Sequence, residues 1–159
     1  MALAPANVLV VTLKGSLEPQ LLCVARQQKW MTGCCLSGQE LMRQVRTNEV
    51  RVLVLQLSGA CPMVGEVELI EAMRRGGRPV ATIAIAREHS VALESRIRAA
   101  GATCYLAMPL DPEELVAAVN TQTARHQLAN SGRSGVTPPF VGSARAAPGG
   151  STLKERRPA

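Results

Sequence analysis

The distribution of apolar positions along the chain predicts buried strands that alternate with amphipathic helices. Five short apolar runs, most of them rich in β-branched residues, start near residues 8, 31, 51, 79 and 103. Each is followed by a stretch whose apolar residues recur at the three- and four-residue spacing of one helix face. Strands separated by single helices form parallel sheets with right-handed crossovers. The pattern therefore predicts an α/β fold, with a five-stranded parallel sheet and helices on both faces.

The run from Val52 to Leu57 is the central strand of this prediction. It is apolar throughout except for Gln56, which is typical of a strand that is covered by helices on both faces. Gln56 falls near the carboxyl end of the strand, where open α/β sheets place their ligands and their chemistry. We therefore expect Gln56 to decide which reactions the domain can support.

Two helix starts carry clear capping signals. Ser37 and Glu40 have the spacing of a capping box, in which the hydroxyl and the carboxylate satisfy free backbone N–H groups. Asp111 and Pro112 are suited to the N-cap and the first position of the last helix. Both signals agree with the predicted alternation of strands and helices.

The composition changes near the end of the last predicted helix, which we expect to reach about Leu128. From Asn130 onward Gly, Pro, Ser, Ala and Arg dominate, and such a segment buries too little apolar surface to offset the entropy of ordering. We expect two parts: a domain over residues 1–128 and a disordered, basic tail over residues 129–159.

The charge distribution argues against a specific nucleic-acid partner. The formal net charge is +6, but basic and acidic residues nearly balance over residues 1–120. The excess lies in residues 121–159, where Glu155 is the only acidic residue. Duplex binding favours a basic face on the folded domain, which this distribution does not indicate. No apolar run approaches the 18 residues of a membrane span, so we expect no membrane insertion.

The five cysteines are odd in number and lack the spacing of a metal site. Most lie in apolar runs, so we expect buried, reduced thiols in a cytoplasmic protein, and neither a metal nor another cofactor. Cys61, close to Gln56, is the one cysteine that we expect to be accessible. Neither His89 nor His126 is paired in sequence with a plausible nucleophile, and we expect no enzyme.

Residues 8 to about 120 resemble a response-regulator receiver domain. The resemblance rests on the order and spacing of the strands together with several short motifs. They are Ser37-Gly38-Gln39-Glu40-Leu41, Pro62-Met63-Val64-Gly65, Pro79-Val80, Ala100-Gly101-Ala102, Tyr105-Leu106 before Pro109-Leu110, and Asp111-Pro112-Glu113-Glu114-Leu115. The resemblance implies a flavodoxin-like sheet with the strand order 2-1-3-4-5.

The chemistry of that family is missing from this chain. Receivers phosphorylate an aspartate beside Mg²⁺, which an acidic pair holds, and use a hydroxyl and a lysine to contact the phosphoryl group. Carried over, these positions fall on Thr12 and Leu13 (acidic pair), Gln56 (nucleophile), Ala84 or Ala86 (hydroxyl) and Met108 (lysine). An amide cannot form an acyl phosphate, and Asp111 is the only aspartate in the chain. We expect a degenerate, phosphorylation-independent receiver.

The remaining resemblance points to a protein contact. In receivers the aromatic residue of the fifth strand reports activation to a face made by helix four, strand five and helix five. Tyr105 matches this residue, with Arg96, Arg98, Glu113 and Glu114 as the charged groups of the face. A tyrosine that only packs its ring is an equally good interpretation. We expect a signalling module of a phosphorelay-type system that binds a protein partner or a second copy of itself.

A small-ligand sensor is the alternative. Lys14 and Ser58 follow the first and third strands, and with Gln56 they could hold an anion or a nucleotide in the crevice between these strands. A solvated loop lysine is the simpler interpretation of Lys14.

Overall fold

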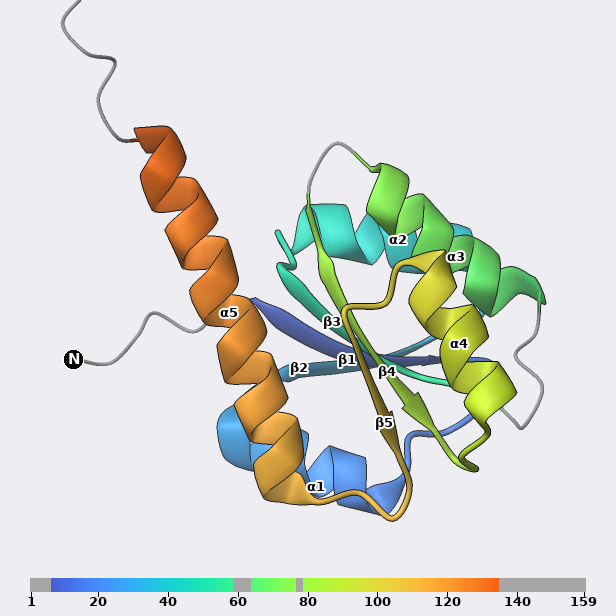
Figure 1. Ribbon diagram of the computed structural model, residues 1–159. Coiled ribbons are helices and arrows are strands. Elements are labelled where there is room, and N and C mark those ends of the chain that lie inside the picture. Colours follow the sequence, from blue (N-terminus) through green and yellow to red (C-terminus); the bar gives the residue numbers. More distant parts are fainter. Residues whose placement is uncertain (1–6, 59–63, 77–78, 135–159) are drawn as a thin grey trace, which may run out of the picture.

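Five parallel strands form the middle layer of the structure (Figure 1). The computed structural model describes residues 7–58, 64–76 and 79–134. The strands are β1 (Val8–Leu13), β2 (Met31–Cys35), β3 (Val52–Gln56), β4 (Ala81–Ala86) and β5 (Cys104–Ala107). Their order in the sheet is β2-β1-β3-β4-β5. The predicted fold class and strand order are confirmed.

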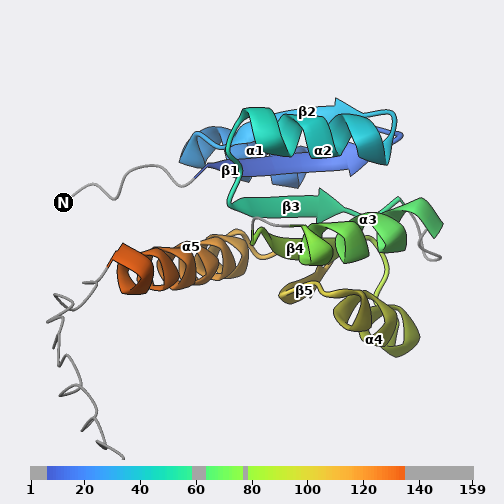
Figure 2. The ribbon, with the colours of Figure 1, turned by 90° about the horizontal axis from the view of Figure 1, so that it is seen from above.

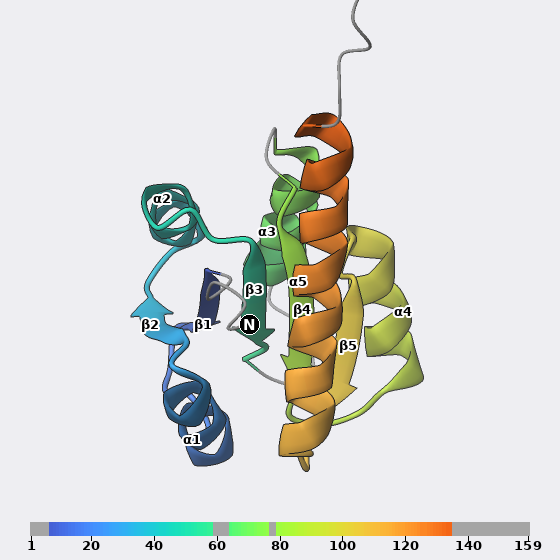
Figure 3. The ribbon, with the colours of Figure 1, turned by 90° about the vertical axis from the view of Figure 1, so that its left-hand side faces the viewer.

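Five helices cover the two faces of this sheet. They are α1 (Pro19–Gln28), α2 (Gly38–Thr47), α3 (Val64–Arg75), α4 (Val91–Ala100) and α5 (Pro112–Ser134). Helices α1 and α5 lie on one face, and α2, α3 and α4 lie on the other (Figures 1 and 3). Each crossover therefore adds one helix, as the pattern predicts.

The central strand β3 separates two apolar clusters. Leu53 and Leu55 pack under α2, α3 and α4, whereas Val52 and Val54 pack under α1 and α5. All four side chains are fully buried. A strand in this position meets apolar surface on both faces, which explains why its sequence is a continuous apolar run instead of an alternating one.

The predicted helix caps are formed. The Ser37 hydroxyl accepts the Glu40 N–H at 3.2 Å, and the Asp111 carboxylate accepts the Glu113 N–H at 2.9 Å. The Glu40 carboxylate accepts the N–H of Leu36 at 3.0 Å, one residue before the cap. Both caps hold their helices at the loops that follow β2 and β5.

Helix α5 runs further than the sequence prediction. It continues to Ser134, so the predicted boundary at residue 128 falls inside the helix. Hydroxyl groups of Thr121, Thr123 and Ser131 donate to the carbonyl groups four residues earlier, which keeps these polar side chains compatible with a helix. The last turns extend past the ends of the strands (Figure 2). Residues 135–159, the rest of the predicted tail, lie outside the described residues.

The cysteines are less buried than we expect from the sequence. Of the four cysteines in the described part of the chain, Cys23 and Cys34 are exposed, Cys104 is half-buried and Cys35 is buried. Cys23 lies on the outer side of α1, and Cys34 belongs to the edge strand β2, which has a partner strand on one side only. Cys61 lies outside the described residues. Within the described ranges, none of the helices has the length and apolar character to span a bilayer.

Candidate functional site at the carboxyl edge of the sheet

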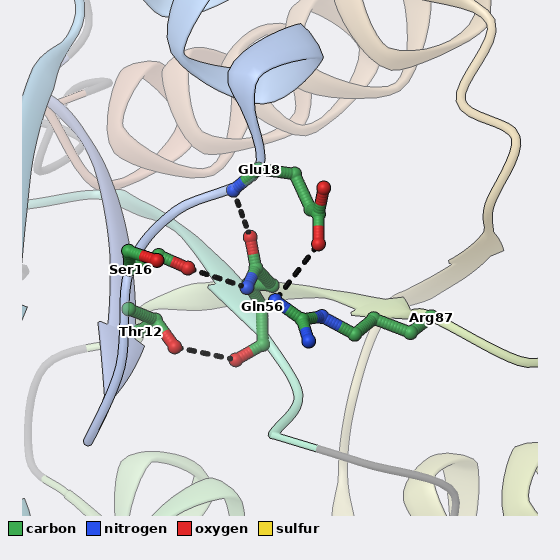
Figure 4. Close-up of polar contacts among 5 residues, drawn as sticks. All are labelled: Thr12, Ser16, Glu18, Gln56 and Arg87. Carbon is green, nitrogen blue, oxygen red and sulfur yellow. Dashed lines mark hydrogen bonds and ion pairs between the residues drawn. The ribbon is translucent and has the colours of Figure 1, made fainter.

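Gln56 ends β3 at the carboxyl edge of the sheet, and its side chain is engaged on both sides. The carboxamide oxygen Oε1 accepts the backbone N–H of Glu18 at 2.8 Å, and Nε2 donates to the carbonyl oxygen of Ser16 at 3.2 Å (Figure 4). Gln56 is only 2% exposed. Its amide therefore holds the segment between β1 and α1 against the sheet, with both of its polar atoms engaged in hydrogen bonds.

The positions that match the family's acidic pair are also buried. Thr12 is aligned with Gln56 across β1 and β3, and its hydroxyl donates to the Gln56 carbonyl oxygen at 3.4 Å. Leu13 belongs to the apolar cluster under α2, α3 and α4. Neither side chain offers an oxygen to a cation at the edge of the sheet.

The last two positions of the predicted degenerate site are apolar as well. Ala84 and Ala86 are fully buried at the end of β4, where Ile85 pairs with Gln56. Met108 follows β5 and packs against the cluster under α1 and α5. The structure thus gathers the five predicted positions at one edge of the sheet, without a carboxylate nucleophile, a free hydroxyl or an ammonium among them.

An ion pair that the sequence analysis missed lies beside Gln56. Arg87, directly after β4, approaches the carboxylate of Glu18 to 2.8 Å (Figure 4). The pair joins the loop after β1 to the loop after β4, and both side chains are partly exposed, so its contribution to stability is modest. No local pattern could reveal it, because the two residues lie far apart in the chain.

The predicted anion site at Lys14 and Ser58 already contains a carboxylate. Glu66 of α3 is 1% exposed, and its Oε1 accepts the Ser58 N–H at 2.9 Å. Lys14 is exposed and lines the same small cavity as Glu66. An anion held by Ser58 would meet the negative charge of Glu66 and find the Ser58 N–H occupied. The geometry therefore disfavours the alternative interpretation, in which Lys14, Gln56 and Ser58 together hold a free anion or a nucleotide.

The charged residues of the predicted interaction face are exposed, whereas Tyr105 is buried. Arg96, Arg98, Glu113 and Glu114 are exposed on α4 and α5. Tyr105 is only 7% exposed and its ring packs at a tilt against His89, with centroids 5.8 Å apart. Its buried hydroxyl has no hydrogen-bond partner. Tyr105 is therefore buried and does not present its side chain to a partner, unlike the four charged residues.

Cys104 of β5 shows how the charges on this face are arranged. Burial raises the pKa of its thiol; among the charged neighbours, Arg98 lowers that pKa and Glu114 raises it. Charges of opposite sign from α4 and α5 thus flank β5. Arg98 also forms an ion pair with Glu94 of its own helix at 2.8 Å. Cys104 is half-buried, and because its thiol pKa is raised it is a weak nucleophile.

Comparison with known proteins gives similarity at the level of structure only. No family model and no curated protein sequence matches the chain. A response-regulator structure from Chloroflexus aurantiacus superposes with a TM-score of 0.62 at 21% identity, over 74% of this chain and 98% of that chain. The signal receiver domain of a diguanylate cyclase from Desulfovibrio desulfuricans superposes with a TM-score of 0.62 at 17% identity. The match covers 77% of this chain and 97% of that domain. A CheY-like receiver domain from Methanospirillum hungatei superposes with a TM-score of 0.59 at 14% identity, over 77% of this chain and 98% of that chain.

The topology and these superpositions assign the chain to a known fold. The sheet order and the two helical layers make it a flavodoxin-like α/β protein. Within that class its fold is that of a response-regulator receiver domain.

Proposed function

We propose that this chain is a receiver-like signalling domain that works without phosphorylation, by binding a protein partner or a second copy of itself, and that it is not an enzyme. The observation that carries the proposal is the state of Gln56. Where a receiver would hold its phosphoacceptor, this chain holds a buried carboxamide with both polar atoms bonded to the loop after β1.

The chemistry of the site supports this proposal. An amide nitrogen is a poor nucleophile and forms no acyl phosphate. Mg²⁺ in phosphoryl-transfer sites is held by one or two carboxylates, and the ends of β1 and β3 supply a threonine, a leucine and a glutamine. Thr12 and Leu13 are buried besides, so restoring activity would need more than a small movement of side chains.

The connections around Gln56 also favour a single conformational state. Gln56 fixes the loop after β1, and the ion pair between Glu18 and Arg87 ties that loop to the loop before α4. A receiver that switches would need these loops to rearrange. We infer that the face of α4, β5 and α5 is held in one form, ready to bind without a covalent signal.

Two measurements test the proposal. After incubation with Mg²⁺ and the phosphodonor acetyl phosphate, the intact mass of the chain should remain unchanged; a stoichiometric gain of one phosphoryl group would refute phosphorylation independence. The second measurement concerns the proposed face of α4, β5 and α5. We expect the double variant Arg96→Glu/Glu113→Lys to lose the self-association that sedimentation detects, or to lose the ability to capture a specific protein partner. Arg43→Glu on α2, an exposed residue on another helix, is the matched control. Equal loss in both variants would contradict the assignment of the face.

A further inference from the structure

A second small site lies next to the degenerate one, on the α2 and α3 side of the sheet. A cavity of about 230 Å³ opens between the turn after β1, the start of α2 and the start of α3. Lys14, Gly38 and Glu66 line it from these three elements. The side chain of Gln56 bonds on the other side, to the segment that leads into α1. The cavity therefore lies beside the Gln56 amide and shares only Leu13 with the five positions of the predicted degenerate site.

Glu66, one of the residues that line the cavity, has a carboxylate that is only half satisfied. Glu66 is 1% exposed; its Oε1 accepts the Ser58 N–H, but its Oε2 is buried without any hydrogen-bond partner. A buried acceptor in this state is unfavourable, and a donor that reaches it is bound correspondingly well. The natural complement to a carboxylate oxygen is a charged N–H group.

The surroundings limit what this donor can be. Lys14 lines the same cavity, yet no ion pair within 4 Å joins it to Glu66 in the described part of the chain. The described residues contain no group of three or more metal-binding side chains, which argues against a metal ion. A primary ammonium group, with three donors in a small volume, fits an isolated carboxylate oxygen best.

The rim of the cavity carries the opposite charge. Lys14 supplies a cation, and α2 begins there with its positive dipole end. The Ser37 hydroxyl caps the N–H of Glu40, whereas the N–H groups of Gly38 and Gln39 have no acceptor within the helix. The rim therefore suits a carboxylate, and Glu66 suits an ammonium.

The cavity continues into a wider hollow that has room for an apolar group. This hollow, of about 550 Å³ between α2 and α3, shares Gly38 and Gly65 with the smaller cavity and is lined further along by Met42 and Leu69. At Gly65 a Cβ atom would meet no other atom within 4 Å, so this junction is open. A side chain attached to the bound group could extend over the apolar wall.

We propose that this site binds a free α-amino acid with an apolar side chain. Its ammonium group pairs with Glu66, its carboxylate lies between Lys14 and the start of α2, and its side chain follows the hollow between α2 and α3. The proposal is independent of the proposed function, because the face of α4, β5 and α5 contributes nothing to this site.

The first test compares ligands on the full chain by titration calorimetry. L-leucine and L-methionine are expected to bind, and glycine at least tenfold more weakly because it leaves the hollow empty. Isopentylamine lacks the carboxylate and 4-methylpentanoate lacks the ammonium, so both should bind at least tenfold more weakly than L-leucine. Two outcomes would overturn the proposal. One is that neither L-leucine nor L-methionine binds at 20 mM, roughly the limit for a site of low-millimolar affinity. The other is that 4-methylpentanoate binds as tightly as L-leucine.

The second test changes the protein. Glu66→Gln keeps an oxygen for the Ser58 N–H and removes the charge, so we expect at least a tenfold loss of L-leucine affinity. Lys14→Gln, at an exposed residue, should lose affinity without risk to the core. Glu71→Gln, on the same helix and outside both cavities, is the control and should bind as the wild type does. Unchanged affinity in Lys14→Gln and in folded Glu66→Gln would refute the site.

Discussion

At the scale of the residue, Gln56 has a structural role at the carboxyl edge of the sheet. Its two hydrogen bonds satisfy the Glu18 N–H and the Ser16 carbonyl. Without Gln56, these two partly buried backbone groups would lose their hydrogen-bond partners. When a buried polar side chain is the hydrogen-bond partner of two backbone groups, the conformation of the segment that carries those groups depends on that side chain. The residue that a phosphotransfer site would use as a nucleophile here fixes the loop after β1.

This role predicts the effect of Gln56→Leu. The substitution keeps the volume roughly constant but leaves two backbone groups without partners, so we expect the free energy of unfolding to fall by about 2 kcal/mol. Urea unfolding followed by circular dichroism measures it. Gln27→Leu, at an exposed position of α1, is the control and should change stability by less than about 0.5 kcal/mol. An equal loss in the two variants would contradict the role of Gln56.

The same scale shows what the sequence could and could not predict about the site. Gln56 was predictable, because its place in an apolar strand and the order of the strands define the carboxyl edge. Glu66 and the pair of Glu18 with Arg87 were not, because they depend on which surfaces of distant loops and helices come together. Buried charge outside strands carries no periodic signal in the sequence.

At the scale of the element, the strands and most helices follow from periodicity, and α5 shows the limit of that argument. Its first half has an apolar side that packs on the sheet, with Leu115 and Val119 buried. Beyond residue 128 the helix has no such side, and Leu128 itself is 74% exposed. There the helix continues by backbone propagation and hydroxyl bonds, which apolar spacing cannot reveal.

The middle of α5 makes stability depend on pH. Burial lowers the pKa of His126 from its usual 6.5, and the nearby charge of Arg51 lowers it further. The unfolded chain therefore takes up a proton at higher pH than the folded chain, so stability is full above about pH 6.5 and falls as the pH drops toward the lowered value.

We expect thermal unfolding to show this loss between pH 7.5 and pH 5.5, and His126→Gln to reduce it. The comparison is between the pH slopes of the two proteins, so a uniform effect of the substitution on stability does not interfere. An identical slope in wild type and His126→Gln would show that the folded and unfolded chains bind this proton equally well.

At the scale of the whole molecule, the fold and the chemistry of a receiver separate cleanly. The strand order, the helical layers and the two apolar clusters depend on many residues that are all present. Phosphotransfer depends on a few side chains at one edge of the sheet, and the two apolar clusters do not require those particular side chains. The fold was therefore predictable from the distributed pattern, whereas the function must be argued from the particular atoms at the edge.

This separation predicts that restoring one residue does not restore the reaction. In Gln56→Asp a carboxylate returns to β3, but it is shorter, and it can no longer donate to the Ser16 carbonyl. Thr12 and Leu13 still supply no carboxylate for Mg²⁺, and Met108 supplies no ammonium for the phosphoryl group. The acceptor would lack the carboxylates and the lysine with which receivers hold Mg²⁺ and stabilise the transition state, and the nearby Arg87 is already paired with Glu18.

We expect Gln56→Asp to be less stable than the wild type and to gain no phosphoryl group from acetyl phosphate and Mg²⁺, as measured by intact mass. Gln56→Asn serves as the matched control, since it shortens the side chain equally and keeps the amide. Stable phosphorylation of Gln56→Asp, absent from Gln56→Asn, would show that the remaining edge of the sheet still supports phosphotransfer and that the interaction face can still be switched.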